Sequence, residues 1–339
     1  MTLSRRALLL VVPALICPLF LASCNRDSGK IKIAVVTNNP EDFWTIAEKG
    51  AQDAANKHGV ELIFRKPDKG EAGLQLNILN ELVTKGVKGI AVSVINPKEQ
   101  SPDLQRIAGQ TNLITMDNDA EESGRLCYIG TDNYVAGKAV GELVKEVMPN
   151  GGTVAIFVGQ REPINAQQRF QGVIDALAGT KDAKGPTLGK YTLYKNDMIT
   201  DNAQRATCVD NAKDAIEKLS GTENICMVGL WAYNAPAILE AAKSKGAVGK
   251  IKIVSFDEYP DTLTAIERGE IYATVVQDPY NFGYKSVEIL AEAAKSGDKS
   301  AVSKEPVRNI PHRIVAKEEG KDRLAVKKFS ADLNRLLGK

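Results

Sequence analysis

Side chains suited to binding a small polar molecule follow the apolar runs of this sequence, where strands are expected to end. The set combines aromatic, amide, acidic and guanidinium groups: Asn39, Phe43, Trp44, Asn96, Asp117, Asn118, Arg169, Trp231, Asp257 and Gln277. Carboxylates accept hydrogen bonds, a guanidinium donates them through a rigid fork, and amides do both. Flat aromatic rings can cover the C–H faces of a ring-shaped ligand. A pyranose or furanose requires this combination of groups.

Taken singly, these residues have structural explanations. An Asp or Asn after a strand often caps the next helix, a lone Trp often belongs to the core, and an Arg on a helix often forms a surface ion pair. The set as a whole favours a binding site, because both tryptophans of the chain occupy strand ends, one in each half. In the segment "NNPEDFW", residues 38–44, we expect at least one of Phe43 and Trp44 to face the ligand.

Short apolar runs alternate with amphipathic segments along nearly the whole chain. This alternation predicts βαβ units with parallel sheets covered by helices on both faces. About ten strands are too many for one strongly twisted open sheet, so two sheets in two lobes are expected. The predicted strands are 31–36, 60–65, 89–95, 112–116, 126–129, 152–158, 190–194, 225–230, 251–256 and 272–276. The predicted helices include 43–58, 74–86, 133–147, 166–179, 201–219, 233–245 and 280–296.

The N-terminus has the pattern of an export signal. Arg5 and Arg6 precede an uncharged apolar stretch that ends in Leu21-Ala22-Ser23-Cys24. This order is typical of a secretory leader over residues 1–23. The ending L-A-S-C resembles the bacterial lipobox, which implies cleavage before Cys24 and lipidation of that residue. An uncleaved membrane anchor is the alternative interpretation.

Charge and motif content exclude several classes of function. Two of the 44 basic residues lie in the leader, which leaves 42 basic against 42 acidic side chains and gives no footprint for nucleic acid. The sequence lacks G-x-S-x-G, H-E-x-x-H, a Walker loop and G-x-G-x-x-G, and its only histidines are His58 and His312. We therefore expect no enzyme activity, no cofactor and no metal. A transcription regulator would need a helix-turn-helix where this chain has its leader.

Three cysteines follow Cys24 and have apolar neighbours: Cys127, Cys208 and Cys226. Free buried thiols are expected, with a Cys208–Cys226 disulfide as the alternative.

Several segments together resemble the sugar-binding proteins of bacterial ABC importers, the ribose-binding-like group of type 1 periplasmic binding proteins. The resemblance covers roughly residues 31–317. Its motifs are "NNPEDFWTIAEKGAQDAANKHG", "GVKGIAVSVINP", "LITMDND", "YIGTDNYVAGKAVGEL", "QQRFQGVIDAL" and "IVSFDEYPDTLTAIERGEIYATVVQDPYNFGYKSVEIL".

The resemblance implies two Rossmann-like lobes joined by three crossovers, with the sugar between them. It implies the segments 31–131 plus 278–307 for the N-terminal lobe and 132–277 plus 308–318 for the C-terminal lobe. Outside this range, the polar residues 24–30 predict a short lipidated tether. The last segment, 319–339, is charged and weakly helical, and we expect it to be a solvated C-terminal extension. In the family, residues at positions equivalent to Asn39, Phe43, Trp44, Asn96, Asp117, Arg169, Asp257 and Gln277 contact the sugar. The implied partners are a sugar and an ABC permease, for a monomeric receptor outside the cytoplasm.

Two positions depart from the ribose-binding pattern. Asp117 is followed by Asn118 instead of Arg, and Trp231 replaces an Asn. These changes alter which ligand hydroxyls the site can bind, and they narrow the cavity. They argue against ribose, so a pentose, hexose or related polyol remains the expected ligand. A sensor of a sugar or autoinducer that signals to a membrane kinase or chemoreceptor remains the alternative function.

Overall fold

The computed structural model describes residues 29–41 and 43–338, so the predicted leader and Cys24 lie outside the described residues. Residues 31–339 form one compact unit, which is built on two β-sheets. We call the first sheet with its helices the first lobe, and the second sheet with its helices the second lobe. Within the described part of the chain, no helix is both long and apolar enough to span a membrane.

The first lobe contains a six-stranded parallel sheet with the order β13-β5-β4-β3-β1-β2. Its strands are β1 (Lys32–Val36), β2 (Glu61–Arg65), β3 (Gly89–Val92), β4 (Asn112–Met116), β5 (Tyr128–Gly130) and β13 (Val307–Asn309). Its helices are α1 (Phe43–His58), α2 (Ala72–Thr84), α3 (Pro97–Ala108), α9 (Pro279–Ser296) and the short α10 (Ser300–Ser303), with a 3-10 turn at Glu121–Ser123.

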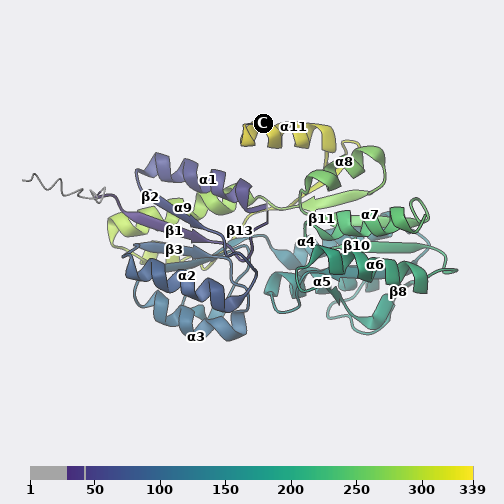
Figure 1. Cartoon of the computed structure of the whole chain (residues 1–339), viewed down its shortest axis with the longest axis horizontal. Coiled ribbons are helices and arrows are strands. Elements are labelled where there is room, and N and C mark those ends of the chain that lie inside the picture. The colour runs from purple at the N-terminus through teal and green to yellow at the C-terminus, as the bar shows by residue number, and fades with distance from the viewer. Residues whose placement is uncertain (1–28, 42, 339) are drawn as a thin grey trace, which may run out of the picture. The chain divides into compact units, whose positions relative to one another are not determined.

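Alternation along β1 shows why both faces of this sheet are covered. Ile33 and Val35 pack against α1 and α9, whereas Ala34 and Val36 pack against α2 and α3 on the opposite face. Figure 1 shows these two pairs of helices on opposite sides of the sheet. Helices α1 and α9 approach closely, because a Cβ on Gly283 would lie 1.9 Å from the carbonyl oxygen of Ala47. The apolar runs predicted from the sequence are therefore buried on both sides, as a parallel sheet requires.

The second lobe contains a nine-stranded sheet with the order β15-β14-β12-β11-β10-β6-β8-β7, in which β9 also pairs with β6. Its strands are β6 (Gly152–Val158), β7 (Thr187–Leu188), β8 (Tyr191–Leu193), β9 (Ile199–Thr200), β10 (Ile225–Gly229), β11 (Ile251–Phe256), β12 (Ala273–Val276), β14 (Arg313–Ala316) and β15 (Arg323–Ala325). Its helices are α4 (Asn133–Val147), α5 (Ile164–Ala178), α6 (Arg205–Lys218), α7 (Asn234–Ser244), α8 (Pro260–Arg268) and α11 (Val326–Leu337), with a 3-10 turn at Tyr194–Asn196.

Helices again cover both faces of the second sheet. Ile156 and Val158 face α4 and α5, and Phe157 faces the side that carries α6 and α7.

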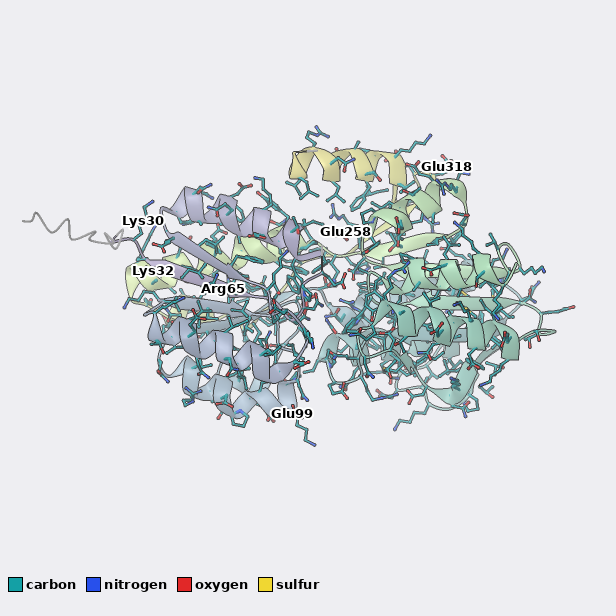
Figure 2. The ribbon with its side chains drawn as sticks, in the orientation of Figure 1. Lys30, Lys32, Arg65, Glu99, Glu258 and Glu318 are labelled. Carbon is teal, nitrogen blue, oxygen red and sulfur yellow. The ribbon has the colours of Figure 1, made fainter. Side chains whose placement is uncertain are left out.

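Charged side chains such as Arg65, Glu99 and Glu318 are exposed, whereas Glu258 is buried (Figure 2). The three cysteines Cys127, Cys208 and Cys226 are free and buried, so the alternative disulfide is not formed.

The chain passes between the two sheets three times: between β5 and α4, between β12 and α9, and between β13 and β14. Strand β13 ends in the first sheet at Asn309, two residues beyond the boundary expected from the sequence. Because these connections are short, the strand ends of both sheets stay close to the same junction.

The C-terminal segment 319–339 is not the solvated extension that its charges suggested. Strand β15 pairs in parallel with β14, and α11 buries Val326 and Phe329 in the core of the second lobe. The guanidinium of Arg313 lies 5.5 Å from the centre of the Phe329 ring. The apolar residues of α11 recur every three to four positions, so one face is buried while the charged residues occupy the other.

Candidate functional site

A cleft lies where loops from the strand ends of the two lobes meet, with an empty volume of about 450 Å³. The cleft is lined by Asn38, Asn39, Glu41, Phe43, Trp44, Asp117, Asn165, Arg169, Trp231, Ala232, Tyr233, Asp257 and Gln277. Ligands of open α/β sheets bind outside the carboxyl ends of the strands, and this cleft has that position in both sheets.

The loop between β1 and α1 supplies the aromatic wall of the first lobe. The side-chain oxygen of Asn39 accepts hydrogen bonds from the backbone N–H of Glu41 and from Trp44 Nε1, each at 3.0 Å. Trp44 is 1 % exposed, whereas Phe43 is half-buried, and the two rings meet edge to face with centroids 5.1 Å apart. Phe43 therefore offers its ring to the cleft, and Trp44 mainly supports it from the core.

Asp117 projects from the end of β4 in a left-handed backbone conformation, with φ 60°. Ser93 Oγ donates a hydrogen bond of 2.8 Å to its Oδ2, and the hydroxyl of Tyr128 donates one of 2.9 Å to its carbonyl oxygen. Burial raises the pKa of Asp117, an effect that the nearby Arg169 opposes. The carboxylate is thus held by its neighbours and retains acceptor capacity for a ligand.

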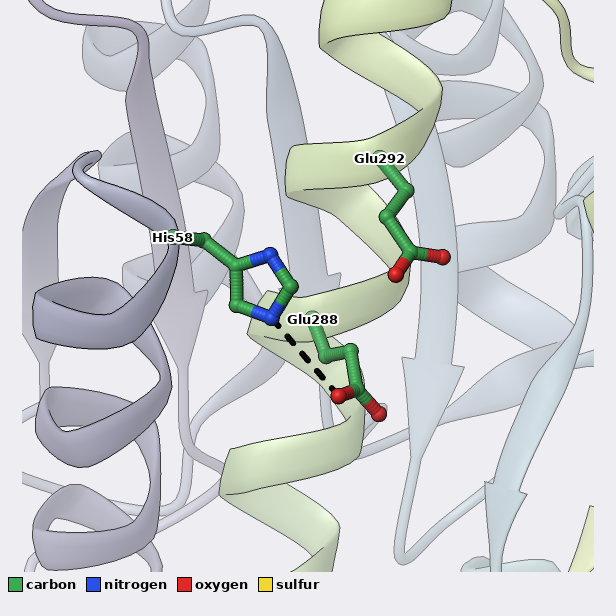
Figure 3. Close-up of side chains that lie close together, drawn as sticks. All are labelled: His58, Glu288 and Glu292. Carbon is green, nitrogen blue, oxygen red and sulfur yellow. Dashed lines mark ion pairs between the residues drawn. The ribbon is translucent and has the colours of Figure 1, made fainter.

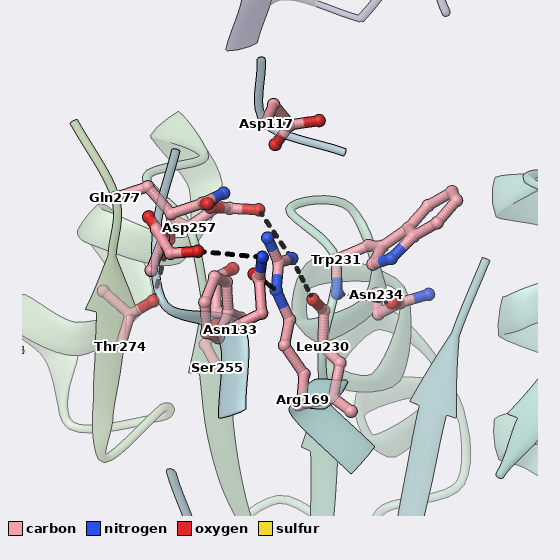
Figure 4. A network of polar contacts seen from close by, with 12 residues as sticks. Asp117, Asn133, Arg169, Leu230, Trp231, Asn234, Ser255, Asp257, Thr274 and Gln277 are labelled. Atoms are coloured by element: carbon pink, nitrogen blue, oxygen red, sulfur yellow. Dashed lines mark hydrogen bonds and ion pairs between the residues drawn. The ribbon is translucent and has the colours of Figure 1, made fainter. Parts of the chain in front are cut away.

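Arg169, on α5, is 2 % exposed and is the guanidinium of the cleft. Its Nε donates to Asn133 Oδ1 at 2.8 Å and its Nη1 donates to the carbonyl oxygen of Leu230 at 2.9 Å. The guanidinium also stacks on the ring of Phe256 at 3.9 Å. Figure 4 shows the hydrogen bonds of Arg169 to Asn133 and Leu230, with Asp257 beside the guanidinium. Arg169 is therefore fixed before any ligand binds.

Asp257 and Gln277 extend from the ends of β11 and β12. Gln277 Nε2 donates a 2.9 Å hydrogen bond to Asp257 Oδ1, and Arg169 Nη1 lies 3.9 Å from Asp257 Oδ2. Asp257 also has a left-handed backbone, with φ 68°. Burial raises the pKa of Asp257 to about 6, although the positive charge of Arg169 lowers it.

Five buried polar atoms of the cleft have no hydrogen-bond partner among the described residues. They are two donors and three acceptors: Arg169 Nη2, Trp231 Nε1, Asn38 Oδ1, Asn165 Oδ1 and Gln277 Oε1. A buried polar atom without a partner costs about 1–3 kcal/mol. Such a concentration in one cleft indicates that a ligand with several donors and acceptors completes these hydrogen bonds.

Two of the residues selected from the sequence do not line the cleft. Asn96 is the N-cap of α3, where its Oδ1 accepts a hydrogen bond from the backbone N–H of Glu99 at 3.3 Å. Asn118 Nδ2 donates a hydrogen bond to the carbonyl oxygen of Val94, and Asn118 Oδ1 accepts one from the backbone N–H of Asn165 at 3.1 Å. The structural explanation of an Asn after a strand therefore applies to Asn96. Asn118 links the two lobes beside the cleft.

Other cleft residues were missed from the sequence: Asn38, Glu41, Asn165, Ala232 and Tyr233. Asn38 and Glu41 belong to the same loop as Phe43, and Tyr233 follows Trp231 by two residues. Selecting the whole loop after each strand, instead of its most polar members, would have found most of them.

A cluster of potential metal ligands lies on the first lobe, outside the cleft. The nearest ligand atoms of His58, Glu288 and Glu292 lie within 4.8 Å of one another (Figure 3). Lys285 Nζ is 2.7 Å and Lys57 Nζ 3.5 Å from the carboxylate of Glu288. The carboxylate of Glu288 is already paired with these two ammonium groups. We therefore assign the cluster to the packing of α1 against α9.

The fold and the cleft together define a two-lobed α/β receptor that encloses a small polar ligand. Residues 33–299 match the family described as "Periplasmic binding protein domain". The chain belongs to this family, and its parallel sheets agree with the type 1 fold.

Similar proteins include the D-allose-binding periplasmic protein of Escherichia coli, which is 25 % identical over 79 % of this chain and 85 % of its own length. The ribose import binding protein of Salmonella typhimurium is 25 % identical over 88 % of this chain and 95 % of its own length. Among solved structures, the glucose-galactose binding protein GanP of Geobacillus stearothermophilus is 27 % identical, with a TM-score of 0.76 over 86 % of this chain and 99 % of its own.

Proposed function

We propose that the protein is an exported receptor that binds a neutral monosaccharide or related polyol between its lobes and delivers it to an ABC permease. The single observation that carries this proposal is the group of five unpartnered buried polar atoms in a cleft that also holds aromatic rings. Hydroxyl groups both donate and accept, so one sugar can satisfy donors and acceptors together. The relatives named for allose, ribose and glucose-galactose binding support the same ligand class.

Closure of the lobes would couple binding to delivery. Phe43 and Asp117 come from the first lobe, and Arg169, Trp231 and Asp257 come from the second. A ligand that contacts both lobes stabilises the closed arrangement, whereas a ligand that contacts only one lobe shifts nothing. The three connections between the sheets are the hinge in this mechanism.

The proposed roles follow from the chemistry of each side chain. Phe43 stacks on the C–H face of the sugar, supported by Trp44 and Asn39, and Trp231 contributes a second aromatic surface. Asp117 and Asp257 accept hydrogen bonds from hydroxyls, while Arg169 and Gln277 complete the polar contacts. Charge-assisted hydrogen bonds are about twice as strong as neutral ones, which offsets the removal of water from the hydroxyls.

The decisive experiment is a thermal-shift screen of the purified protein against pentoses, hexoses and polyols, followed by calorimetry on each compound that raises the melting temperature. We expect one subgroup of neutral sugars or polyols to bind, and mass spectrometry to recover it chemically unchanged. A screen in which no sugar or polyol binds would overturn the proposal. Conversion of the bound sugar would instead indicate an enzyme.

Sugar affinity should fall as the pH drops through about 6, the pKa of Asp257. Below this pH the free receptor holds a proton on Asp257, and the protonated group has lost acceptor capacity that the hydroxyls require. The pKa of Asp117 is raised in the same direction. Each protonated group would weaken binding about tenfold per pH unit below its pKa. Calorimetry between pH 8 and pH 5 measures this dependence. An affinity that does not change over that range would contradict the prediction.

Lipidation at Cys24 is the proposed link to the membrane. The L-A-S-C ending of the leader supports it. When the full chain is expressed in bacteria, we expect wild type to enter the detergent phase of a Triton X-114 partition and to incorporate labelled palmitate. Cys24→Ser should do neither. Equal behaviour of the two proteins would contradict a lipid anchor at this residue.

A further inference from the structure

In the second lobe, Trp231 and Tyr233 form an aromatic wall of the cleft. The buried carboxylate of Asp201 lies behind this wall and does not line the cleft. Asp201 follows β9 directly and is 1 % exposed. The hydroxyl of Tyr233 donates to its Oδ1, and Asn234 Nδ2 donates a 3.0 Å hydrogen bond to its Oδ2. Both carboxylate oxygens are thus bound by residues next to, or within, the wall of the cleft.

Asn234 transmits the position of Asp201 to Trp231. Asn234 is fully buried, and its Oδ1 accepts a 2.9 Å hydrogen bond from the backbone N–H of Trp231. Because the amide Nδ2 must point at the carboxylate, the amide oxygen must point at Trp231. Asp201 therefore selects one of the two orientations that the Asn234 amide could adopt.

Gly159, at the end of β6, forms the other support of this wall. A Cβ on Gly159 would lie 2.2 Å from the indole Cε3 and Cζ3 of Trp231 and 2.8 Å from the hydroxyl of Tyr233. The carbonyl oxygen of Gly159 also accepts a 3.1 Å hydrogen bond from the backbone N–H of Ala203, in the loop that carries Asp201. The indole of Trp231 thus packs on Gly159, and the Trp231 backbone is held by the hydrogen bonds that run from Asp201 through Asn234.

Placing a carboxylate in this position is unfavourable in itself. Burial raises the pKa of Asp201 to about 6. An Asn would avoid the burial of a charge, but its single acceptor oxygen could not receive both Tyr233 and Asn234. The use of an acid here therefore points to a requirement for two acceptors.

We infer that Asp201 is a positioning residue that fixes Trp231 and Tyr233 and thereby sets which ligands fit the cleft. The part of this inference that concerns ligands rests on the proposed function. The part that concerns Trp231 does not, and it can be tested without any ligand.

The test uses the full chain labelled with 5-fluorotryptophan. The chain has only two tryptophans, so ¹⁹F NMR should give one resonance from Trp44 and one from Trp231, assigned with Trp231→Phe. In Asp201→Asn the side chain keeps its shape but has a single acceptor oxygen, so either the hydrogen bond from Tyr233 or the one from Asn234 is lost. We expect the Trp231 resonance to shift or broaden while the Trp44 resonance stays in place.

The matched control is Asp175→Asn. Asp175 is also buried and accepts a hydrogen bond from a tyrosine hydroxyl, that of Tyr134 at 2.8 Å, but it does not line the cleft. This control should leave both resonances unchanged. An unchanged Trp231 resonance in Asp201→Asn, or an equal shift in Asp175→Asn, would overturn the inference. If Asp201→Asn does not fold, Asn234→Ser keeps Asp201 and removes the link, and the same criteria apply.

Calorimetry with D-allose, D-ribose and D-glucose as probes tests the consequence for binding. For any probe that binds wild type, we expect Asp201→Asn to weaken binding about 10- to 100-fold and to change the ratio of affinities between probes. Asp175→Asn should leave the affinities and their ratio unchanged. Unequal losses support a role in selectivity, whereas unchanged affinities overturn that role. If none of these probes binds wild type, the sugar found in the screen takes their place. If no sugar or polyol of the screen binds, the proposed function fails, while the NMR result still decides the position of Trp231.

Discussion

Asp257→Asn is expected to weaken sugar binding about 100-fold or more while leaving the protein folded. The substitution keeps the shape of the side chain but removes the charge from its hydrogen bonds with the ligand. Hydrogen bonds to charged groups contribute about 1.5–3 kcal/mol each. The amide has one acceptor oxygen where the carboxylate has two, so one such bond is lost and the other is weakened, which gives an effect of this size. Calorimetry with the sugar found in the screen measures it.

The same substitution should not lower the melting temperature at pH 7. Burial raises the pKa of Asp257 from 3.8 to about 6, so between these values the folded state holds more protons than the unfolded state. The free energy of unfolding therefore decreases as the pH rises through this range, and at pH 7 the ionised group is a net destabilising feature. A neutral Asn removes that feature, and the Asp117 carboxyl remains near the Arg169 guanidinium as a second acidic partner. We therefore expect an equal or higher melting temperature by calorimetry.

Glu258→Gln is the matched control for Asp257→Asn. Glu258 is the next residue and is also buried, but it does not line the cleft. Burial, together with the charge of Asp257, raises the pKa of Glu258 well above its usual value. Its replacement should leave affinity close to wild type. Asp257 does not belong to the site if both variants bind the sugar as tightly as wild type.

Much of the fold could be predicted from the sequence because parallel strands here are buried on both faces. Such strands form continuous apolar runs between helical segments, as "KIAVV" in β1 and "TVAIFV" in β6 illustrate. The structure confirms an α/β fold with two mainly parallel sheets. The C-terminal segment was misread because α11 has a charged outer face that conceals its apolar stripe until β14 and α8 are placed beside it.

The candidate site could be predicted less completely, because position after a strand does not determine where a side chain points. Asp117 and Asp257 reach the cleft from left-handed backbone conformations that the sequence does not reveal. Asn96 has the same position after a strand, but its side chain caps a helix. Asp201 was missed because the very short strand β9 that precedes it has no apolar run to mark it.

The two rings of "NNPEDFW" show how a local ambiguity is resolved by packing. Neighbouring residues at the start of a helix point in different directions, so only one of Phe43 and Trp44 can face the core fully. The larger ring, Trp44, takes the core position and donates to Asn39, which leaves Phe43 at the cleft. The sequence could predict that one ring is displayed, but the core that selects between them is built from helices distant in the chain.

Arg169→Met should have the largest combined effect, lowering the free energy of unfolding by about 3–5 kcal/mol and reducing sugar affinity to an undetectable level. Met retains an unbranched chain that can lie on Phe256, but it provides no donors. The carbonyl oxygen of Leu230 and Oδ1 of Asn133 then lose their donor, and Asp257 loses its nearby cation. Removal of one partner of a buried ion pair is strongly destabilising because it leaves the other charge uncompensated.

Urea denaturation measures the change in stability, and calorimetry with the sugar measures the change in affinity. Arg161→Met is the matched control, since Arg161 pairs with Asp197 at 2.8 Å but both side chains are 48 % exposed. Exposed pairs contribute about 0–1 kcal/mol, so this control should retain nearly all stability and affinity. Relative to Arg169→Met, the double variant Arg169→Met with Asp257→Asn should gain more stability than Asp257→Asn adds to wild type, because it removes the uncompensated carboxylate. If the effect of Asp257→Asn is the same in both backgrounds, the two single effects add, the two groups are not coupled and Arg169 does not anchor the charge balance of the cleft.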